Sequence, residues 1–397
     1  MKWEKVAIKD ICTGIYDGPH ATPPLSDTGA IFLGISNFNN GRLDFSDIRY
    51  ISEDDLPKWT KRVIPQKNDI VFSYEATLNL YAIIPEGFRG CLGRRMALLR
   101  VDETKAYYKF LYYYFYSDTW RATVNENIVL GATVDRIPLI KFPDFPVELP
   151  PLETQHRIAD ILSVYDNLIE NNQKQIKLLE EAAQRLYKEW FVDLRFPGHE
   201  NTKFVDGVPE GWSKSTVGNI CKLRKVVITP DKIESNTPYI GLEHMPRNDI
   251  CLSTWGKSEE INSNKFIYLK KDVLFGKIRP YFHKVGFALN DGITSTDTMV
   301  MVADQNLWGL LLVTVSSDAF VDFSYQNCKE GAKMPRADWK QMEKYAIMIA
   351  DQATQKLFEQ EILVITNKIS ALAFQCRSLR EARDRMLPKL MGGEVEV

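Results

Sequence analysis

The chain has 397 residues, enough for two or three domains that each bury a core. Its 50 lysines and arginines balance 52 aspartates and glutamates, so any DNA-binding surface must be a local concentration of positive charge. The 6 cysteines lie far apart without a C-x-x-C pair, which argues against a zinc ribbon and fits reduced thiols. No run approaches the roughly 18 apolar residues of a membrane span, and the charged N-terminus lacks an apolar signal region, so we expect a soluble, cytoplasmic protein.

Short β-rich runs broken by Gly, Asn, Asp and Pro fill residues 1–150 and predict a mixed or antiparallel sheet. The clearest runs are residues 31–35, 69–74, 80–84 and 95–101. A helix is expected from Lys105 to about Thr123. Its tyrosines could stack on bases, but such a stripe more often packs on its own domain, and we favour that interpretation. They are Tyr107, Tyr108, Tyr112, Tyr113, Tyr114 and Tyr116.

Residues 153–196 contain neither Gly nor Pro and place apolar residues alternately four and three positions apart, which is a heptad seam. A helix of about 35 residues is roughly 50 Å long and needs a partner for this stripe. Asn172 occupies one seam position, either fixing the register or simply tolerated near an exposed part of the seam. The seam residues that we single out are Ile158, Leu162, Ile169, Leu179 and Leu186.

The same seam recurs 200 residues later, so two copies of one long helix are predicted. Its members there are Ile362, Ile369, Leu379 and Met386, with Arg383 as a polar member. The repeat includes the preceding domains, since Asp69-Ile70-Val71-Phe72 matches Asp272-Val273-Leu274-Phe275. A period of about 200 residues indicates a duplicated domain rather than a solenoid. A second helix is expected around 305–327, equivalent to the one after residue 105.

The predicted fold class is therefore α+β, with two similar α/β domains separated by two long antiparallel coiled-coil helices in a pseudo-two-fold internal repeat. The expected parts are a first recognition domain, a first spacer helix, a linker, a second recognition domain, a second spacer helix and a tail. They comprise residues 1–150, 151–196, 197–211, 212–348, 349–391 and 392–397.

Catalytic signatures are missing from the sequence. No G-x-G-x-x-G follows a strand, there is no G-x-x-x-x-G-K-[ST] and no N-P-P-Y or D-P-P-Y, and the five histidines are scattered without metal-ligand spacing. Pro230-Asp231 matches a nuclease pattern only weakly. We therefore expect no covalent chemistry by this chain alone, with no catalytic, cofactor-binding or metal-binding residues.

Three kinds of stretch have the composition of a DNA-reading surface. The turn-rich loop 16–24 offers hydrogen-bonding side chains, although an ordinary surface loop is an equally open interpretation. Residues 270–284 are rich in Lys and Arg, with Arg279 suited to bidentate recognition of guanine, and here we favour function over a solvated face. The pair GATVDR (131–136) and GAKMPR (331–336) precedes each long helix. The candidate DNA-binding residues are Tyr16, His20, Thr22, Arg94, Thr133, Arg136, His244, Lys277, Arg279, Tyr281, Lys284, Lys333 and Arg336.

Two similar but non-identical domains on an antiparallel helix pair would read two different short sequences separated by an unread spacer. Half-sites of dimeric DNA readers lie roughly 34 to 36 Å apart. A helix pair of roughly 50 Å can bridge that distance.

Four segments, 150–191, DGPHATPP (17–24), LFGKIRPYFHK (274–284) and GAKMPR, resemble the specificity subunit of type I restriction-modification systems, and the likeness covers nearly the whole chain. The resemblance implies a non-catalytic subunit that recognises an asymmetric bipartite DNA site, one half by each domain. It also implies two modification subunits that use S-adenosylmethionine to methylate adenine. In the full complex it implies two restriction subunits that use ATP and Mg to translocate and cleave. This chain itself would hold no cofactor and contact no membrane.

One departure from the family pattern is that the second helix opens at Ala350 without the Pro-Pro-Leu of the first, so docking at that end is expected to differ in detail. The outer helix faces and the Trp190-Phe191 end are candidate contacts with modification subunits, although Trp190 lies on the seam and core packing is the stronger interpretation. Two alternatives stay open. One is a protein scaffold that does not read DNA, and the other is a specificity subunit of another methyltransferase-nuclease system.

Overall fold

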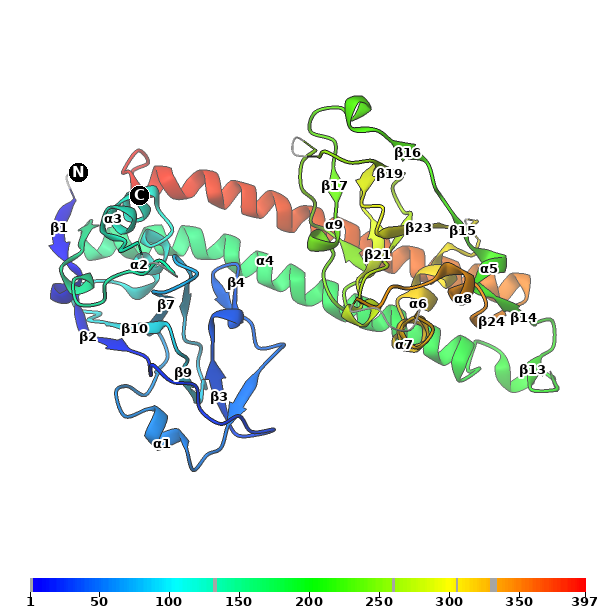
Figure 1. Ribbon diagram of the computed structural model, residues 1–397, viewed down its shortest axis with the longest axis horizontal. Coiled ribbons are helices and arrows are strands. Elements are labelled where there is room, and N and C mark those ends of the chain that lie inside the picture. Colours follow the sequence, from blue (N-terminus) through cyan, green and yellow to red (C-terminus); the bar gives the residue numbers. More distant parts are fainter. Residues whose placement is uncertain (1–2, 131–133, 259–260, 305, 329–333) are drawn as a thin grey trace. The chain divides into compact units, whose positions relative to one another are not determined.

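The computed structural model describes residues 3–130, 134–258, 261–304, 306–328 and 334–397. The chain divides into two compact units (Figure 1). Unit 1 consists of Met1–Asn167 and Leu379–Val397, and unit 2 consists of Leu168–Ser378. In the described part of the chain, no helix is long and apolar enough to cross a membrane.

Unit 1 is centred on an antiparallel sheet with the strand order β2-β10-β7-β8. All four residues of β7 are buried, which is typical of a central strand covered on both faces. A second sheet has the order β6-β3-β9, with β3 parallel to β9, and the pairs β1-β11 and β4-β5 complete the strands. These strands are β1 (Glu4–Ala7), β2 (Cys12–Asp17), β3 (Ala30–Leu33), β4 (Phe38–Asn39), β5 (Arg42–Leu43), β6 (Arg49–Ile51), β7 (Ile70–Ser73), β8 (Tyr81–Ile83), β9 (Gly90–Leu92), β10 (Met96–Val101) and β11 (Pro146–Leu149).

The single helix expected from Lys105 to about Thr123 is wrong, because the structure has two helices there. The chain is extended at Ser117, whose hydroxyl accepts the Trp120 N–H at 3.2 Å and so starts a new helix. The tyrosines Tyr112, Tyr113 and Tyr114 are buried, which confirms that this stripe packs on its own domain. The helices of unit 1 before the long ones are α1 (Leu56–Trp59), α2 (Tyr108–Tyr114) and α3 (Asp118–Asn127), with the 3-10 turns η1 (Ile8–Ile11), η2 (Ile35–Asn37) and η3 (Phe142–Asp144).

Unit 2 repeats this plan with a five-stranded sheet in the order β15-β23-β20-β21-β18 and a four-stranded sheet in the order β16-β19-β22-β17. The central strand β20 is entirely buried, as β7 is in unit 1. The pairs β14-β24 and β12-β13 complete the strands. They are β12 (Phe204–Val205), β13 (Val208–Pro209), β14 (Ser213–Thr216), β15 (Lys222–Leu223), β16 (Val227–Ile228), β17 (Tyr239–Ile240), β18 (Cys251–Leu252), β19 (Lys265–Tyr268), β20 (Val273–Gly276), β21 (Val285–Ala288), β22 (Gly292–Thr294), β23 (Thr298–Val302) and β24 (Ala346–Ile349).

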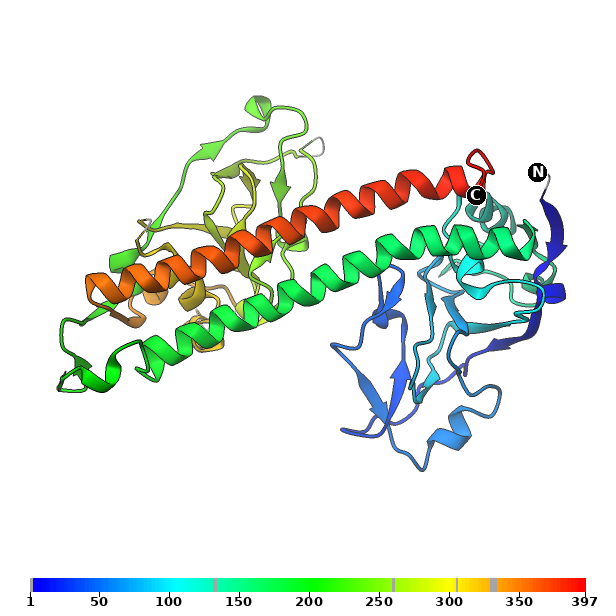
Figure 2. The ribbon, with the colours of Figure 1, turned by 180° about the vertical axis from the view of Figure 1, so that it is seen from behind.

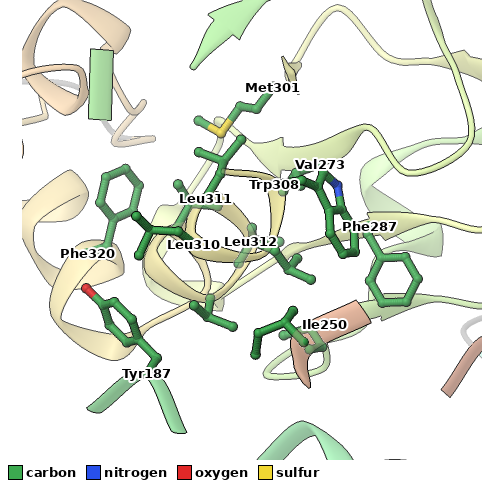
Figure 3. Packing of buried hydrophobic residues seen from close by; sticks show 14 of the residues in the cluster. Tyr187, Ile250, Val273, Phe287, Met301, Trp308, Leu310, Leu311, Leu312 and Phe320 are labelled. Carbon is green, nitrogen blue, oxygen red and sulfur yellow. The ribbon is translucent and has the colours of Figure 1, made fainter. Parts of the chain in front are cut away.

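The helix expected around 305–327 is also divided in two, again at a serine that caps the second helix. The Ser317 hydroxyl accepts the Phe320 N–H at 3.3 Å. Every residue of the first helix, α6, is buried, and Figure 3 shows Leu310, Leu311 and Leu312 at the centre of the cluster between Phe320 and Phe287. The short helices of unit 2 are α5 (Val217–Ile220), α6 (Trp308–Val315), α7 (Asp318–Gln326) and α8 (Trp339–Met342), with the 3-10 turns η5 (His199–Asn201), η6 (Pro230–Lys232), η7 (Leu242–His244) and η8 (Pro280–Phe282).

Two long helices, α4 (Leu152–Tyr187) and α9 (Gln352–Met391), contribute to both units, and α4 continues into a π-helical turn, η4 (Lys188–Val192). In unit 1 the start of α4 lies beside the end of α9, and in unit 2 the end of α4 lies beside the start of α9 (Figure 2). The helices are therefore antiparallel within each unit. Of the seam residues, Ile158, Leu162, Ile169, Ile362 and Ile369 are buried, and Leu179, Leu186, Leu379 and Met386 are half-buried.

The structure also shows the surroundings of Asn172 and of the Trp190-Phe191 end of the first long helix. Asn172 is buried, and its amide donates to the Gln375 side chain at 3.3 Å, as a register-fixing role expects. Trp190 and Phe191 are both buried, with the Trp190 ring centroid 5.6 Å from that of Phe358. These two side chains therefore belong to the core of unit 2 and do not form an exposed docking surface.

The polar seam member Arg383 is neutralised by a buried carboxylate. Its guanidinium donates to Asp166 at 2.6 Å, and the Tyr113 hydroxyl donates to the other carboxylate oxygen at 2.7 Å. Asp166 is only 8% exposed, so its charge depends on these partners. The pair stabilises the helix packing of unit 1 as long as both charges are present.

We expect Arg383→Met to lower the free energy of unfolding by on the order of 3 to 5 kcal/mol, because it leaves a buried carboxylate unpaired. Adding Asp166→Asn to the Arg383→Met variant should restore part of that loss, since the amide oxygen still accepts from Tyr113. Urea unfolding measures both, with exposed Lys389→Met on the same helix as the control. Equal losses for Arg383→Met and Lys389→Met would contradict the role of the pair.

A second buried carboxylate joins α4 to β18 in unit 2. Glu180 is 4% exposed, and its Oε1 accepts the N–H groups of Ile250 at 2.9 Å and Cys251 at 3.2 Å. Burial, and then the charge of Asp249, raise the pKa of Glu180 to about 8, against the opposing effect of the two N–H donors. Between its ordinary value of 4.5 and about 8, the folded chain keeps a proton that the unfolded chain loses. The contribution of Glu180 to stability therefore decreases as the pH rises through this range.

Glu180→Gln should raise the free energy of unfolding at pH 9 by on the order of 1 to 4 kcal/mol, because a neutral amide oxygen still accepts both N–H groups. The gain should shrink toward zero below pH 4.5, where the wild-type carboxyl is protonated in both states. Urea unfolding across this pH range tests it, with exposed Glu181→Gln as the control. A gain that does not vary with pH would refute a raised pKa of Glu180 in the folded chain.

Candidate nucleic-acid interface

In both units the chain leaving the central strand is held by the same set of backbone hydrogen bonds. The loop 74–79 follows β7, and the loop 277–283 follows β20. Each is bonded to the turn before β10 or β23, and to the segment ending at residue 137 or 337. In unit 1 the bonds run from Ser73 N to Leu80 O, Tyr74 N to Arg95 O, Ala76 N to Asp135 O and Ile137 N to Tyr74 O, at 2.8 to 3.1 Å. In unit 2 they run from Gly276 N to Lys284 O, Lys277 N to Asp297 O, Arg279 N to Pro335 O and Ala337 N to Lys277 O, all at 2.8 Å.

Both loops begin and end their turn with a residue in the left-handed backbone region. The φ angles are 69° at Ala76 and 60° at Asn79 in unit 1, and 51° at Arg279 and 51° at His283 in unit 2. Residues other than Gly adopt this conformation only where the surrounding structure holds them there. The two loops are therefore equivalent, rigidly held turns at the same edge of the two central sheets.

The loop 16–24 lies against the same region of unit 1. Gly18 donates its N–H to Met96 O at 2.8 Å, and a Cβ at this position would lie 2.7 Å from that oxygen, so only glycine permits the approach. The Asp17 carboxylate lies 2.8 Å from His20 Nε2 and 3.2 Å from the Arg62 guanidinium. Burial, and then the Asp17 carboxylate, raise the pKa of the Tyr74 hydroxyl.

The predicted unit 1 residues have different environments. His20, Thr22, Arg94 and Arg136 are exposed. Arg136 forms backbone bridges to Glu75 and Val129, which place it beside the loop 74–79. Tyr16 is half-buried and packs on the sheet, with the Arg100 guanidinium 5.7 Å from its ring, so most of its surface is used inside the unit. Thr133 lies outside the described residues.

A cluster of cations surrounds the loop 277–283, which is the equivalent loop in unit 2. Arg336 forms a backbone bridge to Ile278 and an ion pair with Asp297 at 2.7 Å. Burial, and then the cations Arg336 and Lys225, hold the pKa of Lys277 below its ordinary value, against the opposing effect of Asp297. Concentrated positive charge of this kind is what a polyanion would neutralise. Lys333 lies outside the described residues.

Aromatic side chains accompany the cations of the loop 277–283. Tyr281 is 46% exposed and its ring centroid is 5.2 Å from that of Tyr325, which is equally exposed. The guanidinium groups of Arg247 and Arg279 lie 4.0 and 5.7 Å from the centroid of the Phe282 ring. Stacking faces and cations together suit both bases and phosphates.

Two predicted unit 2 residues are committed to internal contacts instead. The Lys284 ammonium donates to Leu242 O at 2.6 Å, and burial, followed by Arg247, holds the pKa of Lys284 below its ordinary value. His244 Nδ1 accepts the Gly241 N–H at 3.0 Å, as Asn37 Oδ1 accepts the Gly34 N–H at 2.9 Å in unit 1. This equivalence assigns His244 to closure of the η7 turn.

Residues that the sequence analysis did not single out complete the two surfaces. They are Asp17, Arg62, Glu75 and Arg95 in unit 1, and Lys225 and Arg247 in unit 2. Glu75 could have been found by extending the internal repeat, because residues 74–79 directly follow the repeated strand. Arg62 and Arg247 lie on loops without a repeated signature, so only the fold brings them here.

The arrangement suits the binding of a nucleic acid. Exposed cations, imidazole and tyrosine side chains can contact phosphates and base edges in each unit. Among the residues that the structure describes, no group of three or more His, Cys, Asp or Glu side chains is placed to hold a metal ion.

Comparisons with known proteins point the same way. Residues 1–181 match the family model described as the type I restriction modification DNA specificity domain. The MjaIX specificity subunit of a type I restriction enzyme from Methanocaldococcus jannaschii is 24% identical over 381 residues, covering 88% of this chain and 82% of that protein. The MjaVIII specificity subunit from the same organism is 31% identical over 243 residues, covering 61% of this chain and 49% of its own. The crystal structure of a type I restriction-modification S subunit from M. genitalium shares the fold, with a TM-score of 0.57 at 16% identity over 98% of this chain and 96% of that one.

Proposed function

Because this chain belongs to the specificity-subunit family of type I restriction-modification systems, we propose that it binds DNA at an asymmetric bipartite site and directs the enzymes of such a complex to it. Each unit would read one half of the site, and the base pairs between the halves would not be read. The chain itself supplies recognition, and the covalent chemistry belongs to its partners.

The observation that carries this proposal is the rigid turn that both units share after the central strand. In each unit this turn displays polar or charged side chains beside an exposed arginine, Arg136 or Arg336. Sequence readers need phosphate contacts that fix the register and side chains that reach base edges. One surface of this kind in each unit supports a reader with two half-sites.

The partners that we propose are two modification subunits, and two restriction subunits in the complete complex. The modification subunits would bind S-adenosylmethionine and methylate adenine, and the restriction subunits would use ATP and Mg. The MjaIX relative, described as the specificity subunit of a type I restriction enzyme, supports such an assembly for this chain. The exposed faces of α4 and α9 are the proposed contacts with the modification subunits, and Val164 and Val364 occupy equivalent exposed positions on them.

DNA binding by the full-length chain should weaken steeply with salt, because each neutralised phosphate contributes about −0.9 to the slope of log K against log salt. Arg136→Ala should reduce the magnitude of that slope by about 1 and weaken binding to all sequences alike. Fluorescence anisotropy with a labelled duplex measures this, and exposed Arg121→Ala on α3 is the control. Binding that is insensitive to salt and sequence would favour the scaffold alternative.

A further inference from the structure

The two equivalent loops combine a shared backbone with different side chains. All four backbone hydrogen bonds and both left-handed positions recur, as set out above. The sequences they carry are nonetheless Tyr-Glu-Ala-Thr-Leu-Asn at 74–79 and Lys-Ile-Arg-Pro-Tyr-Phe-His at 277–283. A left-handed conformation costs free energy at residues other than Gly, so the frame is held by the structure and not by the local sequence. Such a frame presents different side chains at one fixed place.

Arg279 is the cation at the start of the unit 2 turn. Within the described residues its guanidinium has no carboxylate partner, and it lies 5.7 Å from the Phe282 ring. Its neighbours differ, because Lys277 donates to Thr296 O at 2.7 Å and Lys284 to Leu242 O at 2.6 Å. A guanidinium held on a rigid turn with open donors matches the paired acceptors N7 and O6 of guanine.

Unit 1 has no cation at the equivalent place, where Ala76 stands, and presents the carboxylate of Glu75 instead. Glu75 Oε1 lies 3.3 Å from Arg95 Nε, but Arg95 Nε makes no hydrogen bond, so the carboxylate keeps its acceptor capacity. The Glu75 side chain is 27% exposed, which leaves it accessible from the surface. A carboxylate accepts hydrogen bonds and repels acceptor groups, so it suits a base that presents an amino group in the major groove.

We propose that these turns are the paired base-reading elements of the chain, with Arg279 selecting guanine in one half-site and Glu75 selecting an amino-bearing base in the other. The amino group is N4 of cytosine or N6 of adenine, and both fit the same acceptor. This inference rests on the proposed function and specifies which chemical class of base each unit takes.

The test selects bound duplexes from a random pool with the full-length chain and compares the enriched motifs of wild type and variants. Arg279→Ala gives unit 2 the residue that unit 1 carries at this turn, where alanine is accommodated at a φ of 69°. It should reduce the guanine preference at one position by on the order of 5- to 150-fold and leave the other half-site unchanged. Exposed Lys340→Ala on α8 is the matched control.

Glu75→Gln keeps the size of the side chain but adds a donor, which is the arrangement that pairs with N7 and N6 of adenine. A wild-type cytosine at the contacted position should change to adenine, and a wild-type adenine should become more strongly preferred. Glu86→Gln, an exposed glutamate at the other end of the β7-β8 hairpin, should change nothing. Should Glu75→Gln fail to fold, exposed Ala76→Arg tests the same frame by creating a guanine preference in the first half-site.

The outcomes separate the inference from the function on which it rests. A wild-type motif whose first half is unchanged by Glu75→Gln, or whose second half keeps its guanine in Arg279→Ala, would overturn the inference alone. The absence of any enriched motif with folded wild-type protein would overturn the proposed function itself.

Discussion

Burial of apolar surface between helix segments that are far apart in the sequence is the constraint on which both units depend. In unit 1, Ile158 and Leu162 of α4 join Leu390 of α9 in one core with the central sheet. In unit 2, Ala183 of α4 and Phe358 of α9 do the same. Each helix therefore buries its stripe against the other helix and against the domain core. In unit 2 the hydrogen bond between Asn172 and Gln375 joins the two helices across 203 residues of sequence, as a register-fixing role expects.

Rigid cores of this kind allow surface turns to hold conformations that are unfavourable in isolation. The turns after β7 and β20 are anchored at both ends by backbone hydrogen bonds to neighbouring segments, so their side chains are placed without depending on their own sequence. Recognition requires positioned side chains, because a base-edge hydrogen bond distinguishes bases only when its geometry is fixed. A duplicated frame with divergent side chains is a direct physical route to an asymmetric site.

Much of this architecture is predictable from the residues. The heptad spacing predicts both long helices, and the internal repeat predicts two units of one plan. Two features escaped the prediction because they depend on single polar contacts. Ser117 and Ser317 each interrupt a stretch whose apolar pattern predicts one continuous helix. That pattern fits one long helix and two shorter helices equally well, and the serine hydroxyl that caps the second helix decides between them. Arg383 is visible in the sequence as a polar seam member, but its partner Asp166 lies 217 residues away and is identified only by the fold.

The candidate interface was predicted less completely than the fold. Composition pointed to the stretch around Arg279, yet Lys284 and His244 of the predicted set turn inward and close loops. A charged residue in a loop can serve the surface or the fold, and sequence alone does not distinguish the two uses. Glu75 went unnoticed because a single carboxylate carries no motif. It becomes meaningful when the structure aligns its turn with the one that carries Arg279.

The most direct test of the recognition role is a single-molecule methylome of a host that lacks such systems. The host would express this chain together with the modification subunit of its system. The account predicts a new bipartite methyladenine motif with two different halves, which disappears when this gene alone is deleted. Folded, co-purifying proteins that leave no new motif, or a motif that persists without this chain, would contradict it.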